Sequence, residues 1–192
     1  MVGPTLTIAT YLLGSISFGL ILAKRRGVDL RSIGSGNIGA TNVGRALGKR
    51  TGRVVLVLDM LKGFAPVALA RWVLDLPWPW ITGVGLAAVV GHVFPIWYGF
   101  RGGKGAATSG GVLLGALPPI GALTLLTFIV AKKWTRLASV GSLSAATVGA
   151  VMTLAIDGRQ WPVLLATGLW FLVVLRHWEN IIRLLRGEER AG

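Results

Sequence analysis

Long uncharged stretches, separated by short charged segments, dominate the hydrophobic pattern of this chain. No charged side chain occurs in residues 1–23, 76–100, 105–131, 137–156 or 160–175. A helix needs about 20 predominantly apolar residues to cross the hydrocarbon core of a bilayer, and several of these stretches reach that length. The pattern therefore predicts an all-α, polytopic integral membrane protein.

Charged residues at the ends of these stretches predict where each helix enters and leaves the bilayer. We expect membrane-spanning helices at about 4–23, 54–74, 81–100 and 137–156, and a last one that begins near Trp161 and continues past Arg176. The basic, glycine-rich segment 24–53 would lie in the cytoplasm, because Lys and Arg favour that side of a membrane. The turns at 75–80 and 157–160 would then lie outside, together with the N-terminus.

The third uncharged stretch admits two interpretations. A single crossing would put the basic segment 132–136 outside, against the positive-inside bias. Alternatively, Pro118 and Pro119 interrupt the stretch, because proline lacks an N–H donor and clashes with the preceding helical turn. Two short helices, about 105–117 and 119–131, would then return to the cytoplasm, with a turn that is buried in protein or a bilayer that thins locally. We prefer this hairpin, which gives about seven transmembrane helices and a cytoplasmic C-terminus.

Composition and charge further limit the kinds of protein that fit this sequence. Of the 192 residues, 53% are hydrophobic and 14% are charged, and no loop is long enough for a second domain, so residues 1–192 form a single membrane domain. The net charge of +13 would suggest nucleic acid in a soluble protein. Here the basic residues lie mostly at helix ends, which favours membrane orientation and anion binding, and no nucleic acid partner is expected. The absence of cysteine excludes thiol catalysis, and neither a cofactor nor a metal site is expected.

Two glycine-rich loops follow uncharged stretches and are candidate anion sites. Residues 101–111 read Arg-Gly-Gly-Lys-Gly-Ala-Ala-Thr-Ser-Gly-Gly, and residues 34–45 read Gly-Ser-Gly-Asn-Ile-Gly-Ala-Thr-Asn-Val-Gly-Arg. Glycine lets backbone N–H groups approach an anion closely, and lysine adds a point charge. The second loop contains G-x-G-x-x-G, but no strand precedes it, so a dinucleotide fold is not supported. Helix packing alone would explain some of the glycines but not the polar residues among them, which are Ser35, Asn37, Thr41, Asn42 and Arg45.

The remaining candidates are histidines and buried charges. His177 precedes Asn180 on one helix face near the predicted cytoplasmic end of the last span, where a histidine can act as a base or a donor. For His92 we favour a hydrogen-bonded packing role. Asp59 and Lys62 share a helix face. Either a structural pair or a functional role remains open for them, since no third partner is visible.

Three motifs together resemble the bacterial acyl-phosphate-dependent glycerol-3-phosphate acyltransferases. They are residues 34–48, 91–111 and 177–186, which occur in that family's order and spread over most of the chain. The resemblance implies a seven-span protein of the bacterial inner membrane with its active site facing the cytoplasm. It also implies transfer of a fatty acyl group from acyl phosphate to the sn-1 hydroxyl of glycerol 3-phosphate, which is the first step of phospholipid synthesis. Membrane lipid would surround the protein.

The resemblance assigns roles to the candidate residues. His177, Asn180 and Ser35 would be catalytic. The substrates and their phosphates would contact Arg45, Lys104, Ser35, Asn37, Thr41, Asn42, Gly102, Gly103 and Ser142. Neither histidine has the aspartate five residues later that soluble-type acyltransferases use. We therefore expect direct attack by the glycerol hydroxyl on the activated acyl phosphate, aided by positioning and electrostatic stabilisation. The alternative is a small membrane transporter of organic phosphate or another anion, but no inverted repeat is visible.

Overall fold

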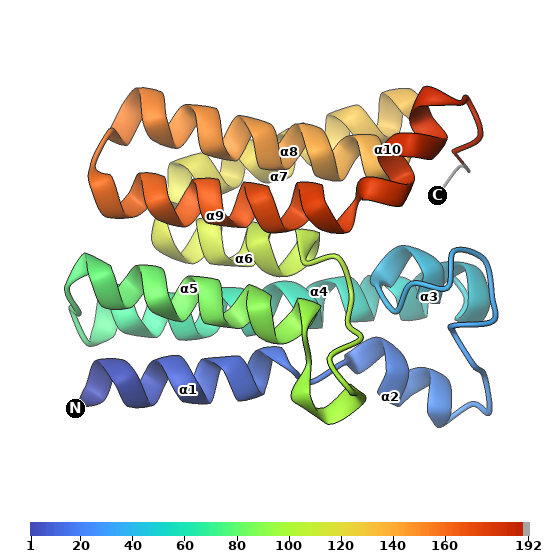
Figure 1. Cartoon of the computed structure of the whole chain (residues 1–192), viewed down its shortest axis with the longest axis horizontal. Helices are drawn as coiled ribbons and strands as arrows, with labels where there is room; N and C mark the ends of the chain where they lie inside the picture. Colours follow the sequence, from blue (N-terminus) through green and yellow to red (C-terminus); the bar gives the residue numbers. More distant parts are fainter. Residues whose placement is uncertain (190–192) are drawn as a thin grey trace.

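The computed structural model describes residues 1–189, in which the chain forms helices and loops and no strand. The helices are α1 (Val2–Gly14), α2 (Phe18–Lys24), α3 (Ala40–Leu47), α4 (Lys49–Ala68), η1 (Leu69–Val73), α5 (Trp78–Val93), η2 (Ile96–Tyr98), α6 (Ala106–Ala116), α7 (Pro118–Thr135), α8 (Ala138–Met152), η3 (Thr153–Asp157), α9 (Gln160–Arg176) and α10 (Trp178–Leu185). Their long axes run roughly parallel or antiparallel (Figure 1). The predicted all-α class is confirmed.

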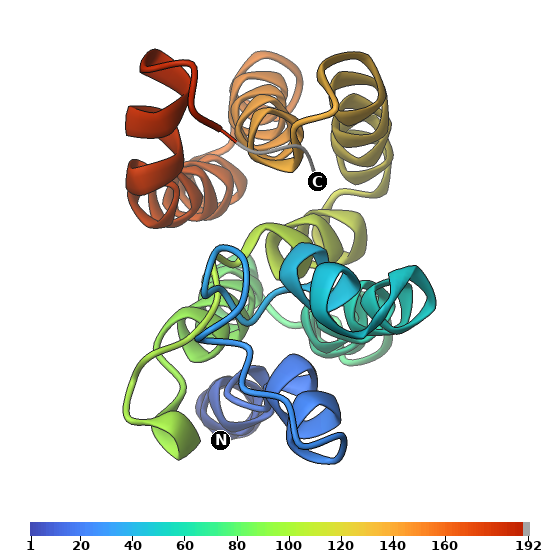
Figure 2. The same cartoon turned by 90° about the vertical axis from the view of Figure 1, so that its right-hand side faces the viewer.

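The helices form two groups with α6 between them. One group contains α1, α4 and α5, and the other contains α7, α8 and α9, as the end-on view shows (Figure 2). Helix α6 packs chiefly against α4 and α7, while α1 packs against α5 and α8 against α9. Because both groups cover it, α6 has eight of its eleven residues buried.

Small residues allow α4 and α6 to approach closely. A Cβ atom added at Gly111 would lie 2.0 Å from the carbonyl oxygen of Met60, and one at Gly63 would lie 2.3 Å from that of Thr108. Side chains at these positions would force the helices apart, which is why membrane helices use small residues at their interfaces. Helix packing therefore does explain some of the glycines in the 101–111 motif.

The predicted hairpin is present. Helix α6 ends at Ala116 and α7 begins at Pro118, so both outer ends of the pair lie at the same end of the molecule (Figure 1). The break at Leu117 is buried. The Arg71 side chain donates to the carbonyl of Ala116, and the Trp72 indole N–H donates to that of Gly115 at 2.8 Å. These donors satisfy carbonyls that the end of a helix leaves unpaired, so the turn is buried in protein, which is one of the two possibilities that the sequence allows for it.

Within residues 1–189, three helical segments are long and apolar enough to cross a membrane, namely Val2–Lys24, Trp78–Tyr98 and Ala138–Asp157, and the bent pair α9 and α10 would add a fourth. The first of these segments agrees with the span expected at about 4–23, but it consists of two helices, α1 and α2. Ser17 caps α2 by accepting a hydrogen bond from the N–H of Leu20, which separates α2 from α1 because a capping residue is not itself helical.

Labelling of single cysteines would test the sidedness of the hairpin. We expect a Lys133→Cys variant to react with a membrane-impermeant thiol reagent only from the cytoplasmic side. The chain contains no cysteine, so the background is low. Asp75→Cys, at the opposite end of the helices, is the control and should react from outside. Labelling of Lys133→Cys from outside would contradict the hairpin orientation.

Candidate functional site

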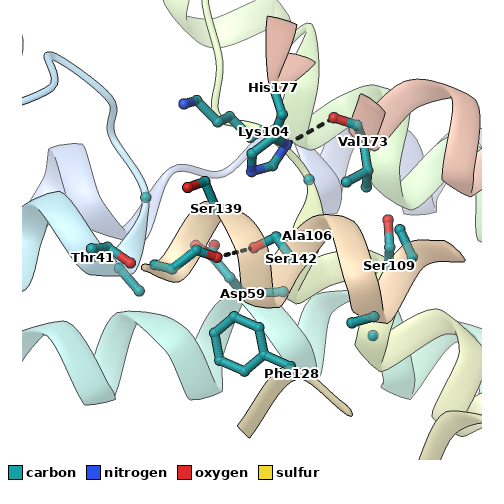
Figure 3. Close-up of a pocket in the computed structure, with 18 of the residues that line it drawn as sticks. Thr41, Asp59, Lys104, Ala106, Ser109, Phe128, Ser139, Ser142, Val173 and His177 are labelled. Atoms are coloured by element: carbon teal, nitrogen blue, oxygen red, sulfur yellow. Dashed lines mark hydrogen bonds between the residues drawn. The ribbon is translucent and has the colours of Figure 1, made fainter. Parts of the chain in front are cut away.

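A cavity of about 530 Å³ opens between the two helix groups. Its polar end is lined from α3, α8, α10 and the two glycine-rich loops, and its apolar end from α6, α7, α8 and α9 (Figure 3). Most of the predicted site residues line it, namely Ser35, Asn37, Thr41, Asn42, Arg45, Lys104, Ser142, His177 and Asn180. The structure thus brings together residues that lie up to 145 positions apart in the sequence, from Ser35 to Asn180.

Asn42 shapes the loop that precedes α3. Its side-chain amide donates to the carbonyls of Leu30 and Ile33 at 3.1 and 2.9 Å, and its Oδ1 accepts from the N–H of Ser35 at 3.1 Å. The side chain is 1% exposed. With these bonds made, Asn42 positions Ser35 within the site. Asn42 also lines the cavity, and its expected contact with substrate stays a prediction.

The glycine-rich loop before α6 is attached to the end of α5. The N–H groups of Gly102 and Gly103 donate to the carbonyls of Val93 and His92, both at 3.1 Å. The Arg176 guanidinium donates to the carbonyls of the same two glycines. Since these two N–H groups are already bonded, they do not form the expected amide cradle. Gly102 and Gly103 are needed instead for close approach, because a Cβ at Gly103 would lie 2.2 Å from Nε2 of His92.

Lys104 and the first turn of α6 carry the positive potential of this loop. Gly105 adopts a left-handed conformation (φ 81°) as the N-cap, and Ala106 and Ala107 line the cavity. The N–H groups in the first turn of a helix lack partners within the helix and attract anions. The Lys104 ammonium donates to Oδ1 of Asn180. Burial, together with the nearby positive charge of Arg183, lowers the pKa of Lys104 to about 8.

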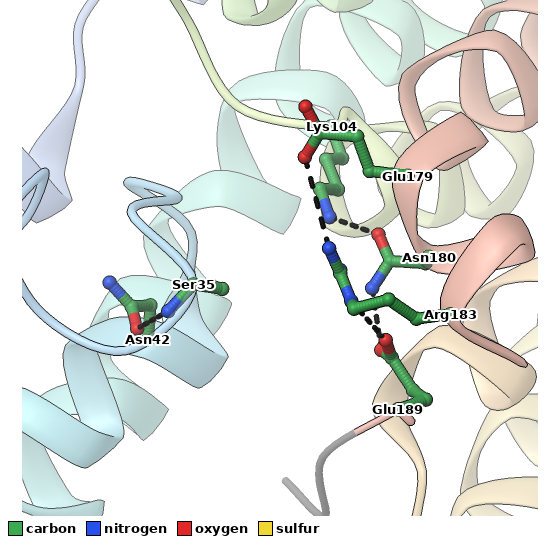
Figure 4. A network of polar contacts seen from close by, with 7 residues as sticks. All are labelled: Ser35, Asn42, Lys104, Glu179, Asn180, Arg183 and Glu189. Carbon is green, nitrogen blue, oxygen red and sulfur yellow. Dashed lines mark hydrogen bonds and ion pairs between the residues drawn. The ribbon is translucent and has the colours of Figure 1, made fainter. Parts of the chain in front are cut away.

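A polar network around α10 holds Asn180 in place (Figure 4). The Asn180 amide donates to one carboxylate oxygen of Glu189, and Nε of Arg183 donates to the other at 2.8 Å. The pKa of Glu189 is lowered: burial alone would raise it, but the hydrogen bonds from Arg183 and Asn180 outweigh that effect. Glu189 was not predicted, because nothing in its local sequence shows that the chain folds back to Asn180. Glu179 also pairs with Arg183, but only loosely, at 3.9 Å.

His177 lies at the bend between α9 and α10 and faces the cavity (Figure 3). Its Nδ1 is 2.8 Å from the carbonyl oxygen of Val173. A carbonyl only accepts, so Nδ1 carries the hydrogen and donates it. In the neutral ring, Nε2 is then the acceptor. His177 is 4% exposed, so little water competes for the hydrogen bond to Val173 that fixes this tautomer.

Two serines complete the polar lining. The Ser142 hydroxyl donates to the carbonyl of Ala138 at 2.9 Å, which leaves its oxygen lone pairs available. The hydroxyl of Ser109, on α6, is buried and has no hydrogen-bond partner within residues 1–189. Ser109 was not singled out from the sequence, although it lies within the 101–111 motif. A buried hydroxyl without a partner in a cavity is available to a ligand.

The opposite end of the cavity is apolar. It is lined by Leu113, Leu125, Phe128, Ile129, Ala145, Leu169 and Trp170. Ile129 is 59% exposed and Trp170 is 37% exposed. Side chains that line the cavity and also face outward indicate that it opens sideways between helices, where a bilayer would surround the molecule. An alkyl chain can therefore enter from the lipid.

A buried charge cluster lies beneath the glycine-rich loop. Nζ of Lys62 is 2.9 Å from the Asp59 carboxylate and donates to the carbonyl of Ile16 at 2.9 Å. Nδ1 of His92 is 3.7 Å from the same carboxylate. His92 is the third partner that the sequence did not reveal. Because its carbonyl also accepts from Gly103, the cluster supports the loop that presents Lys104. Residues 1–189 contain no group of acidic, histidine and cysteine side chains suited to a metal ion.

Comparison with known proteins agrees with this geometry. Residues 5–187 match the family model described as "Glycerol-3-phosphate acyltransferase". The chain belongs to the glycerol-3-phosphate acyltransferase family. Curated relatives of that name include one from Anaeromyxobacter sp. (strain K), 47% identical over 99% of this chain and 97% of the relative. Another, from Aquifex aeolicus, is 45% identical over 96% of each chain.

Solved structures of this family share the fold. The chain is similar to PlsY (YgiH), described as an integral membrane glycerol 3-phosphate acyltransferase, in its glycerol 3-phosphate form, with a TM-score of 0.93 and 43% identity over 100% of this chain and 96% of that one. The lysophosphatidic acid form gives a TM-score of 0.89 and 42% identity over 100% and 95% of the two chains. The predicted family and the integral membrane class are confirmed.

Replacing Gly103 by alanine would test whether the loop needs its close contact with α5. We expect Gly103→Ala to lose most acyltransferase turnover, because the new methyl group would displace either the loop or the His92 ring and so move Lys104. A shift of about 1 Å in a catalytic group can cost on the order of 100-fold in rate. Turnover is measured as phosphate release by the purified protein.

Gly83→Ala is the matched control. A Cβ at Gly83 would lie 3.6 Å from the nearest atom, on Thr7, which is an ordinary contact, so this variant should keep its activity. Normal turnover in Gly103→Ala would show that the loop does not depend on this approach.

Proposed function

We propose that this chain is a membrane-bound acyltransferase that moves a fatty acyl group from acyl phosphate to the sn-1 hydroxyl of glycerol 3-phosphate. The products are lysophosphatidic acid and inorganic phosphate. One observation carries the proposal: a single cavity has a cationic, hydroxyl-lined end and an apolar end that opens sideways. This combination suits two phosphorylated substrates of which one carries a long alkyl chain.

The two cationic loops face each other across the polar end. Lys104 and the start of α6 would hold one phosphate, and Arg45 the other. Asn180, fixed by Glu189, would orient the phosphate held by Lys104. Ser35, Asn37, Thr41 and Ser142 would supply hydrogen bonds to the polar backbone of glycerol 3-phosphate, and the apolar helix faces would take the acyl chain.

The reaction needs little activation of the nucleophile. Acyl phosphate is a mixed anhydride with phosphate as a good leaving group. The sn-1 oxygen forms a new bond to the acyl carbon, and the bond from that carbon to the phosphate oxygen breaks. The hydroxyl proton passes to Nε2 of His177 or to a substrate phosphate oxygen. Lys104 stabilises the negative charge on the departing phosphate, and positioning supplies the rest of the rate.

We further propose seven transmembrane helices in one domain of the bacterial inner membrane, with the N-terminus outside and the C-terminus in the cytoplasm. The basic segment 24–53 and α10 lie at one end of the helices (Figure 1), and residues of both line the cavity. The positive-inside bias supports a cytoplasmic location for that end. A transporter would need a site near mid-membrane that opens to both sides, whereas these polar residues gather at one end.

The choice of acyl donor tests the proposed reaction directly. Purified protein is given glycerol 3-phosphate and either acyl phosphate, acyl coenzyme A or acylated carrier protein, and lysophosphatidic acid is measured. We expect product only from acyl phosphate. A thioester is less activated, and His177, the histidine proposed to take the proton, donates from Nδ1 to the Val173 carbonyl and has no aspartate partner among the described residues to strengthen it as a base.

Heat-inactivated protein is the control for contaminating or uncatalysed transfer. Turnover in detergent, without a sealed compartment, would also separate an enzyme from a transporter. Comparable product from acyl coenzyme A would overturn both the donor assignment and the mechanism.

The pH dependence should report the ionisation of Lys104. Its pKa is lowered to about 8, and the protonated form binds phosphate. Because kcat/KM follows the ionisation of the free enzyme, we expect kcat/KM to fall as the pH rises through about 8. Lys104→Ala should lose most activity at every pH, since a charge-assisted hydrogen bond contributes about 1.5–3 kcal/mol.

Lys104→Arg separates the charge from the geometry. A guanidinium stays protonated throughout this range, so the fall near pH 8 should disappear, although the planar fork should keep the rate below that of the unaltered protein. A fall near pH 8 that persists unchanged in Lys104→Arg would show that another group controls it.

A further inference from the structure

A second, smaller cavity of about 290 Å³ lies beside the catalytic one. It is lined by Arg31, Gly36, Ile38, Phe100, Arg101, Gly102 and Arg176. None of these residues lines the catalytic cavity. The described lining includes three arginines and no acidic residue, which is unusual because like charges repel unless something neutralises them.

The contacts of the three arginines leave this positive charge uncompensated. Nη2 of Arg31 donates to the carbonyl of Arg101 at 3.1 Å, and Arg176 donates to the carbonyls of Gly102 and Gly103. The Arg101 side chain has no hydrogen bond within residues 1–189. In the same part of the chain, no carboxylate forms an ion pair with any of the three. Backbone carbonyls orient two of the guanidinium groups, but a carbonyl carries no net charge and so does not neutralise them.

The two cavities share the segments that form them. Ser35 and Asn37 line the catalytic cavity, whereas Gly36 lines the second one. In the same way, Lys104 lines the first cavity and Arg101 the second. His177 faces the catalytic cavity, and its neighbour Arg176 faces the second. A ligand in the second cavity would therefore contact all three segments that carry the catalytic groups.

The surroundings of the second cavity resemble a membrane interface. Phe100, in its lining, is 57% exposed, and the nearby Trp97 and Trp178 are 58% and 62% exposed. Tryptophan and other aromatic side chains favour the headgroup level of a bilayer. Arginine binds phosphate oxygens through paired N–H donors. Charge, size and position thus fit a phosphate group presented by a lipid.

We propose that Arg31, Arg101 and Arg176 form a second anion site that takes the phosphate of an anionic phospholipid headgroup and steadies the two glycine-rich loops. The site goes beyond the proposed reaction, since neither substrate needs to enter it. Free inorganic phosphate presents the same chemistry, so the experiment must separate a lipid source from a soluble one.

The test compares variants of the purified full chain in nanodiscs. The discs contain phosphatidylcholine alone, phosphatidylcholine with increasing phosphatidylglycerol, or phosphatidylcholine with added inorganic phosphate. The midpoint of thermal unfolding reports binding, and the ratio of turnover with and without the added anion reports coupling to the loops. This ratio does not depend on a general loss of activity in a variant.

We expect phosphatidylglycerol to raise both the unfolding midpoint and the turnover of the unaltered protein. Arg101→Gln should weaken this response about 10- to 100-fold in lipid concentration, as the loss of one charge-assisted contact implies. Arg31→Gln is the independent second variant, should Arg101→Gln fold poorly. Lys133→Gln is the matched control, and its response should be unchanged. Lys133 is exposed and belongs to the last turn of α7, which ends at the same end of the molecule as α10 (Figure 1).

Each alternative outcome has a defined meaning. If inorganic phosphate reproduces the response and both arginine variants lose it, the anion site stands and the lipid source is overturned. If both variants respond to phosphatidylglycerol like the unaltered protein, the site is overturned. An effect of inorganic phosphate that persists in both variants, without any response to phosphatidylglycerol, also overturns it. The choice of acyl donor is measured separately, so the proposed reaction can hold while this site fails.

Discussion

The close approach of α6 to α4 is the contact on which the remaining structure depends. At Gly111 the backbones are so near that an added Cβ would meet the carbonyl oxygen of Met60 at 2.0 Å. This contact places a short helix in the middle of the molecule, covered by both helix groups (Figure 2). Van der Waals packing between small residues provides such stability in a membrane, where burial of apolar surface drives helices together only weakly.

Because α6 lies in the middle of the molecule, its two ends have different roles: one is sealed by protein and the other faces the cavity. At its C-terminal end, Arg71 and Trp72 satisfy carbonyls that the break at Leu117 would otherwise leave unpaired. At its N-terminal end, free N–H groups and Lys104 face the catalytic cavity. A helix buried along its length presents mainly its ends to polar ligands, so the proposed anion site lies at a terminus.

The cationic groups of the site are held mainly by neutral partners. Carbonyl oxygens orient Arg176, an amide oxygen accepts from Lys104, and Glu189 is the carboxylate that contacts Arg183 most closely. Neutral acceptors fix the direction of a cation without neutralising it. The site therefore keeps a positive charge that a phosphate can compensate, and the lowered pKa of Lys104 reflects its burial and, after that, the same excess of positive charge. In the Arg31–Arg101–Arg176 cavity, carbonyl oxygens likewise orient Arg31 and Arg176 without neutralising them.

The sequence alone determined the properties that depend on local chemistry. Uncharged stretches defined an all-helical membrane protein, Pro118 ended α6 because a proline cannot continue the preceding helix, and the three motifs identified the family. The polar residues of both loops were recognised as candidates because glycine and hydroxyl groups beside a basic residue suit an anion. The break between α1 and α2 was missed, because hydropathy does not register a serine cap.

Only the tertiary structure decided which of these residues act on which partners. Asn42 bonds to its own loop, the Gly102 and Gly103 amides bond to the end of α5, and Glu189 reaches back to Asn180. His92 joins Asp59 and Lys62 from a different helix. Each of these pairings depends on which helices lie side by side and at what depth. Hydrophobic periodicity carries no such information, because every apolar helix face can pack against any other.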